Sequence, residues 1–185
     1  ALALGTGMGL GDGAVQTVKK VVDDIEIPIV LDADALTLLN GDLGKLKRLS
    51  KVVITPHPGE AARLLNATTN DIQKNRLAAA RQLASDSGAV VVLKGHNSII
   101  AEPEGTFYLN TTGGNHMAVG GCGDLLTGLV AGLLAQGMDP FKAATLAVWV
   151  HGRAADLAKK EIGPFGLTPT EMAERLPRVW RELRA

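Results

Sequence analysis

Residues 113–124 read Gly-Gly-Asn-His-Met-Ala-Val-Gly-Gly-Cys-Gly-Asp and lead directly into an apolar stretch, Leu125 to Ala135. The apolar stretch has the spacing of a buried helix. Glycines ahead of a helix let the backbone approach a ligand closely and expose its N–H groups, and the positive end of the helix dipole attracts anions. This stretch therefore predicts a phosphate-binding loop at the start of a helix.

Asp124 is the acidic member of this loop. An acid beside an anion site repels the anion unless it has a role of its own. One interpretation is a first-turn carboxylate that complements the helix dipole and stabilises the helix by about 0.3–1 kcal/mol. The other is a general base placed against a substrate hydroxyl, next to the phosphate that is transferred. The residue pattern alone leaves both interpretations open.

Short apolar runs alternate with helical stretches along the rest of the chain, which predicts an α/β fold with a mostly parallel sheet covered by helices on both faces. The predicted strands are Ala1–Leu4, Ile27–Leu31, Val52–Ile54, Ala89–Leu93, Ser98–Ala101 and Thr106–Leu109. The predicted helices are Gly13–Asp24, Ala35–Leu39, Pro58–Leu65, Asp71–Ser85 with an aspartate cap, Cys122–Ala135, Pro140–Lys160, and Thr170–Leu183 interrupted by Pro177.

Three polar clusters follow the ends of predicted strands: Asp32 to Asp34, Thr55 to Glu60, and Lys94 to Asn97. In open parallel sheets, ligands bind outside the carboxyl ends of the strands. We therefore expect these clusters to meet at one edge of the sheet and to form a ligand site with the loop before Asp124.

The composition limits the classes of partner. A length of 185 residues fits one domain, which we assign to residues 1–185. Nineteen basic residues balance nineteen acidic ones, so no global positive field attracts nucleic acid or an anionic membrane. The apolar start of the chain has no basic flank typical of a signal peptide, and a single cysteine, Cys122, fits a reducing cytoplasm.

Four ordered motifs together resemble a known enzyme family. Gly120-Gly121-Cys122-Gly123-Asp124 resembles the G-x-G-D signature of ribokinase-like enzymes, whose glycines form an anion hole and whose aspartate is the catalytic base. His57-Pro58-Gly59-Glu60, Leu93-Lys94-Gly95 and Met117-Ala118 narrow the resemblance to the NAD(P)H-hydrate dehydratases. The resemblance covers nearly the whole chain and implies an enzyme that restores NAD(P)H from its hydrated form with ADP or ATP.

The resemblance also implies roles for individual residues. The nucleotide phosphorylates the hydroxyl of the hydrate, phosphate then leaves, and Mg²⁺ neutralises charge on the phosphates. Asp124 is implied as the catalytic base. The residues implied to contact the hydrated dinucleotide are Gly7, Gly9, His57 and Asp124. Those implied to contact the adenine nucleotide are Lys94, Gly95, His96, Asn97, Ser98, Gly121 and Gly123.

The sequence departs from the family pattern in two places. Thr112-Gly113-Gly114-Asn115-His116-Met117 stands where the family has T-G-N-P/A-G-M, which leaves any ligand role of Asn115 open. Family domains also carry further βα units ahead of the first glycine-rich loop. Three explanations compete: a fragment, a second, complementing chain that supplies the missing strands, and a degenerate protein. We expect the units upstream of Ala1, behind a fused epimerase domain, so that the chain is an N-terminally truncated ribokinase-like domain. Related enzymes are homo-oligomers, so assembly is expected by resemblance.

Three other functions compete with this interpretation. Gly9-Leu10-Gly11-Asp12-Gly13-Ala14 after a strand, with Asp32 about 20 residues onward, matches the fingerprint of a nicotinamide oxidoreductase. The G-x-G-D loop also occurs in ribokinase-like vitamin kinases. A noncatalytic module that keeps only the nucleotide pocket is the third alternative.

Several candidate residues also have structural interpretations. Lys94 is equally consistent with a solvated lysine at a strand end, and one of Asp32 and Asp34 is expected to cap the next short helix. His57 is expected at the edge of the site, whereas His96 and His151 are expected at the surface or in helix packing. No pair of histidines has metal-ligand spacing, so no zinc site is predicted.

Overall fold

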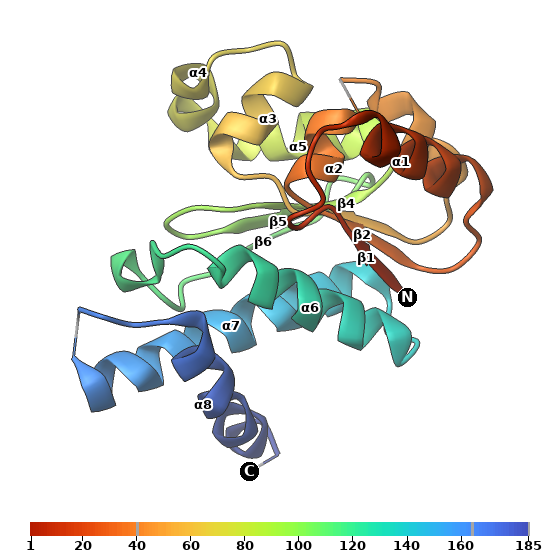
Figure 1. Ribbon diagram of the computed structural model, residues 1–185. Coiled ribbons are helices and arrows are strands. Elements are labelled where there is room, and N and C mark those ends of the chain that lie inside the picture. The colour runs from red at the N-terminus through yellow and green to blue at the C-terminus, as the bar shows by residue number, and fades with distance from the viewer. Residues whose placement is uncertain (40, 164, 185) are drawn as a thin grey trace.

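The apolar runs form a six-stranded sheet in the order β1-β2-β3-β4-β5-β6 (Figure 1). The structure is a computed structural model, and it describes residues 1–39, 41–163 and 165–184. Strands β1 to β4 are parallel, and β5 and β6 add two antiparallel pairings. The prediction of an α/β fold with a mostly parallel sheet is confirmed. The strands are β1 (Leu2–Leu4), β2 (Ile29–Leu31), β3 (Val52–Ile54), β4 (Val90–Leu93), β5 (Ile99–Ala101) and β6 (Phe107–Leu109).

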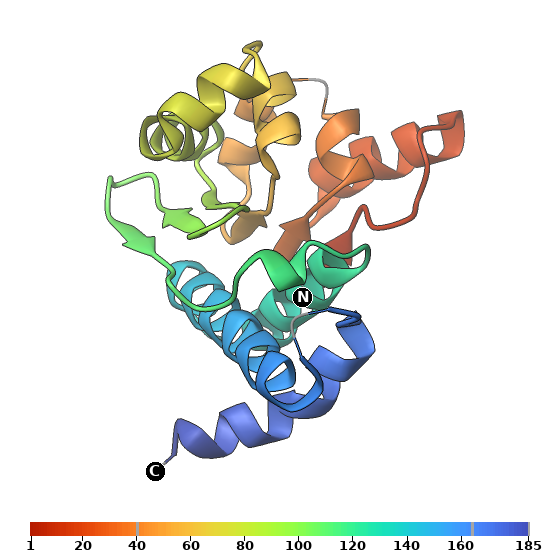
Figure 2. The ribbon, with the colours of Figure 1, turned by 90° about the vertical axis from the view of Figure 1, so that its left-hand side faces the viewer.

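Helices cover both faces of the sheet. One face carries α1 (Asp12–Asp24), α2 (Asp34–Leu38), the 3₁₀ helix η1 (Leu43–Arg48), α3 (Pro58–Leu64), α4 (Thr69–Lys74) and α5 (Arg76–Ser87) (Figure 1). The other side carries α6 (Cys122–Ala135), α7 (Pro140–Ile162) and α8 (Pro169–Glu182), preceded by the 3₁₀ helix η2 (Asn115–Met117). Helix α7 packs against both α6 and α8 (Figure 2). Among the described helices, none is long and apolar enough to cross a membrane.

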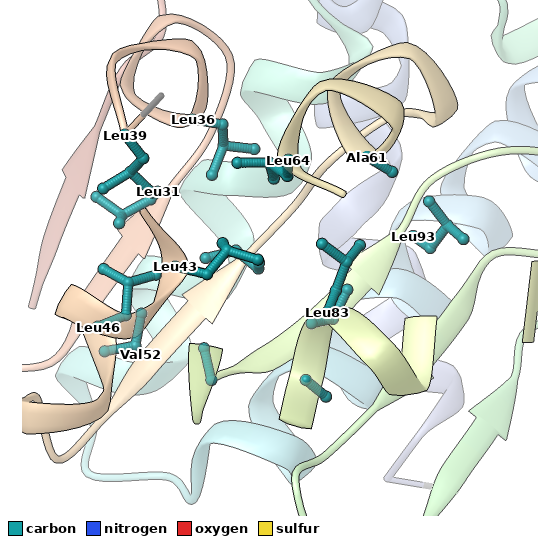
Figure 3. Close-up of a cluster of buried hydrophobic side chains, with 14 of the residues drawn as sticks. Leu31, Leu36, Leu39, Leu43, Leu46, Val52, Ala61, Leu64, Leu83 and Leu93 are labelled. Carbon is teal, nitrogen blue, oxygen red and sulfur yellow. The ribbon is translucent and has the colours of Figure 1, made fainter. Parts of the chain in front are cut away.

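Alternating strand residues feed two separate cores, because successive side chains of a strand point to opposite faces. Leu31 and Leu93 point toward α1 to α5 and pack with Leu36, Leu64 and Leu83, all of them almost completely buried (Figure 3). Val30 and Val92, which directly precede Leu31 and Leu93, point the other way and pack with Val53 of β3 against α6 and α7. A sheet buried on both faces explains why its strands are apolar throughout.

Residues 71–85 differ from the prediction of one helix capped by an aspartate. The structure has two helices, α4 and α5, that meet at Asn75, whose backbone leaves the helical region at φ −147° and ψ 71°. The Asn75 side chain accepts a hydrogen bond from the N–H of Ala78 and so caps α5, while Thr68 caps α4 and Asp71 completes its capping box. The predicted single helix is wrong because an asparagine stabilises a new helix start.

Helix α7 lies unusually close to the segment that joins β6 to α6. A Cβ atom on Gly152 would lie 2.3 Å from Thr112 Oγ1 and 2.7 Å from the Thr112 carbonyl oxygen. The Thr112 hydroxyl also donates to the carbonyl of Trp149, and the N–H of Gly113 donates to Asp156. Figure 2 shows this green segment passing alongside α7. The segment that leads into α6 is therefore positioned by α7.

Two glycine-to-alanine substitutions test this packing. Gly152→Ala should lower the free energy of unfolding by at least about 2 kcal/mol, because the added methyl group overlaps backbone atoms that cannot move freely. Gly132→Ala is the matched control, because nothing lies within 4 Å of its Cβ position. The control should raise the free energy of unfolding by about 0.5–1 kcal/mol, as removal of a glycine from a helix interior does. Urea unfolding measures both, and equal effects would contradict the close contact.

Candidate active site

Polar residues from three strand ends meet at one edge of the sheet, as predicted. The Lys94 ammonium, just after β4, lies 2.7 Å from Asp32 Oδ1, just after β2, and 3.8 Å from Glu60 Oε2, near the start of α3. Asp32 is 1% exposed, and its second carboxylate oxygen accepts a hydrogen bond of 2.8 Å from the hydroxyl of Thr127 in α6. One buried carboxylate thus connects the sheet to the helix that follows the glycine-rich loop.

His57 lies at the edge of this cluster and begins α3. Its ring nitrogen Nδ1 accepts hydrogen bonds from the N–H groups of Gly59 and Glu60, while the Glu60 carboxylate accepts from the N–H of His57 at 2.7 Å. This capping box fixes the His57 side chain, which remains half exposed. The position at the edge of the site agrees with the prediction for His57.

A cavity of about 560 Å³ opens beside this cluster. It lies between the turn after β4, the segment between β6 and α6, and the first turn of α6. The size fits a mononucleotide-sized ligand. The lining comprises His57, Lys94 to Ser98, Asn110, Thr112 to Asn115, Met117 to Val119, Cys122, Gly123, Leu126, Val148, His151 and Gly152.

The turn after β4 is held from outside by an arginine of α5. The Arg76 guanidinium donates to the carbonyls of Leu93 and Lys94 at 3.2 and 3.4 Å, and also to the carbonyl of His96. Gly95 has a φ of +144°, and a Cβ atom there would lie 2.9 Å from the guanidinium. Only a glycine lets the turn approach Arg76 this closely, and the turn then presents residues 94–98 to the cavity.

The glycine-rich loop ends in a left-handed residue, Gly121, with φ +87°, and α6 starts at Cys122. The amides of the first turn of α6 therefore have no partner within the helix, which is the arrangement that favours an anion. Asp124 lies in this first turn and is exposed. Across the described chain, no hydrogen bond or salt bridge of the structure engages its carboxylate, so both of its oxygens are open to a ligand.

Cys122 does not have the surroundings of a nucleophile. Its side chain is buried against Met172, with 3.6 Å between the sulfur atoms. Burial raises the pKa of the Cys122 thiol, partly opposed by a backbone hydrogen bond to Val119. A thiol held neutral is a poor nucleophile, so Cys122 serves as a small packing residue.

The first glycine-rich loop is anchored to the residues after β2. The N–H of Gly9 donates to Asp34 Oδ2 at 2.8 Å, and Gly7 and Gly9 both have positive φ angles of 65° and 77°. The prediction that Asp32 or Asp34 caps the short helix is wrong, because the N-cap of α2 is Ala33 and no side chain caps it. Each carboxylate instead contacts residues far away in the sequence: Asp34 accepts from the N–H of Gly9, and Asp32 binds Lys94 and Thr127.

Of the two positions expected for His151, the structure shows the packed one: His151 is buried in α7 at 6% exposure, and it also lines the cavity. Its Nε2 atom has no hydrogen-bond partner in the described structure. Burial lowers the pKa of His151 to about 4, a backbone hydrogen bond to Cys122 opposes the shift, and the charge of Lys94 adds to it. His151 is therefore neutral at pH 7.

The structure groups only part of the predicted site residues. His57, residues 94–98 and Gly123 line one cavity, whereas Gly7, Gly9, Gly121 and Asp124 lie outside its lining. Sequence reasoning missed Arg76, Thr127 and His151 as parts of this region. The only sequence signal for Thr127 is its place one turn after Asp124 in α6, and Arg76 lies in a region that the sequence predicts as an ordinary helix.

The described residues form no metal cage. No group of three or more His, Cys, Asp or Glu side chains among them could hold a metal ion. Two acids beside the cavity, Asp32 and Glu60, both face the Lys94 ammonium. No residue is therefore assigned to the Mg²⁺ that the resemblance implies, and such an ion would rely on nucleotide phosphates and water for ligands.

Comparison with known proteins identifies relatives of the whole chain. The sequence pattern of a family described as NAD(P)H-hydrate dehydratase matches residues 1–178. A bifunctional NAD(P)H-hydrate repair enzyme from Moorella thermoacetica is 41% identical over 189 residues, which cover 98% of this chain and 34% of the relative.

Solved structures share the fold. One is the ADP/ATP-dependent NAD(P)H-hydrate dehydratase from Bacillus subtilis, co-crystallised with ATP/Mg²⁺ and soaked with CoA, with a TM-score of 0.85, 37% identity, and coverage of 97% of this chain and 65% of its own. The other is a ribokinase-like superfamily protein from Enterococcus faecalis V583, with a TM-score of 0.80, 31% identity, and coverage of 97% and 62%. The ribokinase-like fold is confirmed. The chain spans between about a third and two thirds of the length of these proteins.

The lowered pKa of His151 predicts a specific pH dependence of stability. Between pH 4 and the ordinary histidine value of 6.5, the unfolded chain binds a proton that the folded chain does not, so stability falls as the pH drops through this window. The loss is at most about 1.4 kcal/mol per pH unit for one proton. His151→Gln removes this titration, so its free energy of unfolding, measured in urea at pH 7, 6 and 5, should fall less steeply. Parallel pH profiles of the two proteins would contradict the buried neutral histidine.

Proposed function

Because this chain belongs to the NAD(P)H-hydrate dehydratase family, we propose that it takes part in restoring NAD(P)H from its hydrated form in a reaction driven by ADP or ATP. The observation that carries the proposal is the first turn of α6, where amides without a partner inside the helix and the exposed Asp124 carboxylate stand next to the cavity. An anion site beside a free base is what phosphoryl transfer to a hydroxyl requires.

The proposed cavity occupant is the adenine nucleotide. Residues 94–98 and Gly123 line the cavity, and its wall is partly apolar where Met117, Leu126 and Val148 contribute, as a base-binding pocket requires. The phosphates would then point toward the amides after Gly121. Asp124, Gly7, Gly9 and His57 are the groups proposed to contact the hydrated dinucleotide, on the outer side of the same loop.

The proposed reaction balances as a transfer followed by an elimination. The hydroxyl oxygen of the hydrate attacks the terminal phosphorus of the nucleotide while Asp124 accepts the hydroxyl proton, and the shortened nucleotide is the leaving group. The C–O bond of the phosphorylated hydrate then breaks, inorganic phosphate leaves with the electron pair, and a proton from the neighbouring ring carbon is lost. The double bond of NAD(P)H is restored. Mg²⁺ bound with the nucleotide supplies charge neutralisation in this scheme, without an assigned protein ligand.

The nicotinamide oxidoreductase alternative conflicts with the position of Asp32. That fingerprint needs the acid after the second strand to accept hydrogen bonds from a ribose hydroxyl. Asp32 is 1% exposed, and its two oxygens are occupied by Lys94 and Thr127. Vitamin kinases share the phosphate loop, so the loop does not separate this alternative from the dehydratase. A comparison of turnover with hydrated NADH, a thiazole alcohol and a pyridoxine alcohol as substrates decides between the two.

Assembly and location stay predictions. We propose a homo-oligomer in the cytoplasm and a fused epimerase domain, the latter supported by a relative described as a bifunctional NAD(P)H-hydrate repair enzyme. Sedimentation of the full-length protein measures the oligomeric state. The noncatalytic alternative requires that the protein bind ADP or ATP but not convert hydrated NADH. Nucleotide binding and turnover measured on the same full-length protein therefore test it.

Asp124→Asn in the full-length protein tests the proposed role of this carboxylate. The substitution keeps size and shape but removes the base, so turnover of hydrated NADH should fall at least about 100-fold. The affinity for ADP, measured by calorimetry, should stay within about threefold, because nucleotide binding depends on amides and not on this acid. Glu104→Gln, an exposed acid in the turn between β5 and β6, is the control and should match the native protein. Native turnover in the Asp124 variant would refute the general-base role.

A further inference from the structure

The charged cluster beneath the phosphate loop has no role in the proposed reaction so far. It consists of Asp32, Glu60, Lys94 and Thr127, which come from four separate elements or their ends. Two carboxylates and one ammonium lie largely out of water there, with the Asp32 and Glu60 side chains 2% and 6% exposed and Lys94 20% exposed. Burying charges costs free energy, and a buried ion pair often contributes little net stability. A cluster of this kind next to a ligand cavity therefore suggests a functional constraint.

The Lys94 ammonium lies directly against the first turn of α6. A Cβ atom built on Gly123 would lie 3.6 Å from Lys94 Nζ and 3.7 Å from Asp32 Oδ2. Lys94 and Gly123 also line the same cavity. The fixed positive charge thus stands behind the amides that are proposed to receive the phosphates.

The other members of the cluster restrain the ammonium from several directions. Asp32 binds it at 2.7 Å and is itself held by the Thr127 hydroxyl, while Glu60 lies 3.8 Å away and is held by the N–H of His57 at 2.7 Å. A lysine has a flexible four-carbon chain, so its charge has a defined position only when partners hold it. Asp32 does this while Lys94 still reaches the cavity.

We propose that Asp32 is a positioning residue that holds the Lys94 ammonium behind Gly123, where it stabilises the negative charge of the transferring phosphoryl group. The inference rests on the proposed function for the identity of the reaction. It assigns Lys94 to the phosphate end of the nucleotide and not to its base. Thr127 assists by fixing the Asp32 carboxylate, and Glu60, which the N–H of His57 holds, approaches the ammonium from a second side. A preorganised charge of this kind needs no rearrangement when charge develops in the transition state.

The test uses Lys94→Met, Asp32→Asn and the double variant in the full-length protein. Lys94→Met should weaken ADP binding about tenfold or more and leave adenosine binding unchanged, because adenosine carries no phosphate. Asp32→Asn frees the ammonium, so kcat should fall about tenfold or more while the affinity for ADP is not weakened. Calorimetry with ADP and with adenosine, together with kcat and KM for hydrated NADH, measures these effects.

The double variant separates positioning from folding. Lys94→Met alone leaves two buried carboxylates without a cation and should lower the melting temperature, and adding Asp32→Asn should recover part of that loss. ADP affinity and kcat should stay low in the double variant. The matched control breaks an ion pair elsewhere, Arg153 with Glu182 at 2.8 Å, and Arg153→Met with Glu182→Gln should keep native affinity and kcat.

A double variant with native ADP affinity and native kcat would overturn the inference, since the pair would then serve folding only. Equal losses of ADP and adenosine affinity in Lys94→Met would overturn it as well. If the native protein fails to convert hydrated NADH, the proposed function fails, and the comparison of ADP with adenosine still decides the role of Lys94.

Discussion

The ion pair between Asp32 and Lys94 is the contact on which the arrangement of the site depends. It joins the ends of two parallel strands, and the Thr127 hydroxyl extends it to α6. These strands are β2 and β4, and β3 lies between them, so the ion pair bridges the end of β3. The segment that follows β3 also contacts this pair, because its Glu60 lies 3.8 Å from the Lys94 ammonium. The carboxyl edge of the sheet and the start of α6 are thereby held as one unit. The phosphate loop and the cavity have fixed positions relative to each other as a result.

Close contacts at three glycines position the segments that surround this unit. Gly152 lets α7 contact Thr112, Gly95 lets the turn after β4 contact Arg76, and Gly5 leaves room for the carbonyl of Asp32, which a Cβ atom would approach to 1.8 Å. At Gly152 and Gly5 a side chain would force backbone segments apart, and at Gly95 it would displace the Arg76 guanidinium. The cavity therefore has a shape set by backbone contacts before any ligand binds, which lowers the cost of ordering on binding.

Much of this could be predicted from the sequence. The strand at residues 52–54 and the helix at residues 122–135 have the predicted bounds, because apolar runs and glycine boundaries are local signals. The meeting of the polar clusters followed from the rule for parallel strands. The break at Asn75, the pairing of Asp32 with Lys94 and the place of His151 in the cavity wall could not be predicted, because each depends on contacts between residues far apart in sequence or on a competing local cap. The local sequence indicated a helix cap for Asp32, because its partners Lys94 and Thr127 lie far away in the sequence.

In the proposed reaction, nucleotide phosphate is transferred to the hydrate before the ring double bond returns. The ratio of inorganic phosphate released to NADH formed, when the full-length protein is given ADP and hydrated NADH, tests this order. We expect one phosphate and one AMP for each NADH, with negligible phosphate release when the hydrate is left out. NADH formation without an equal release of phosphate would contradict it.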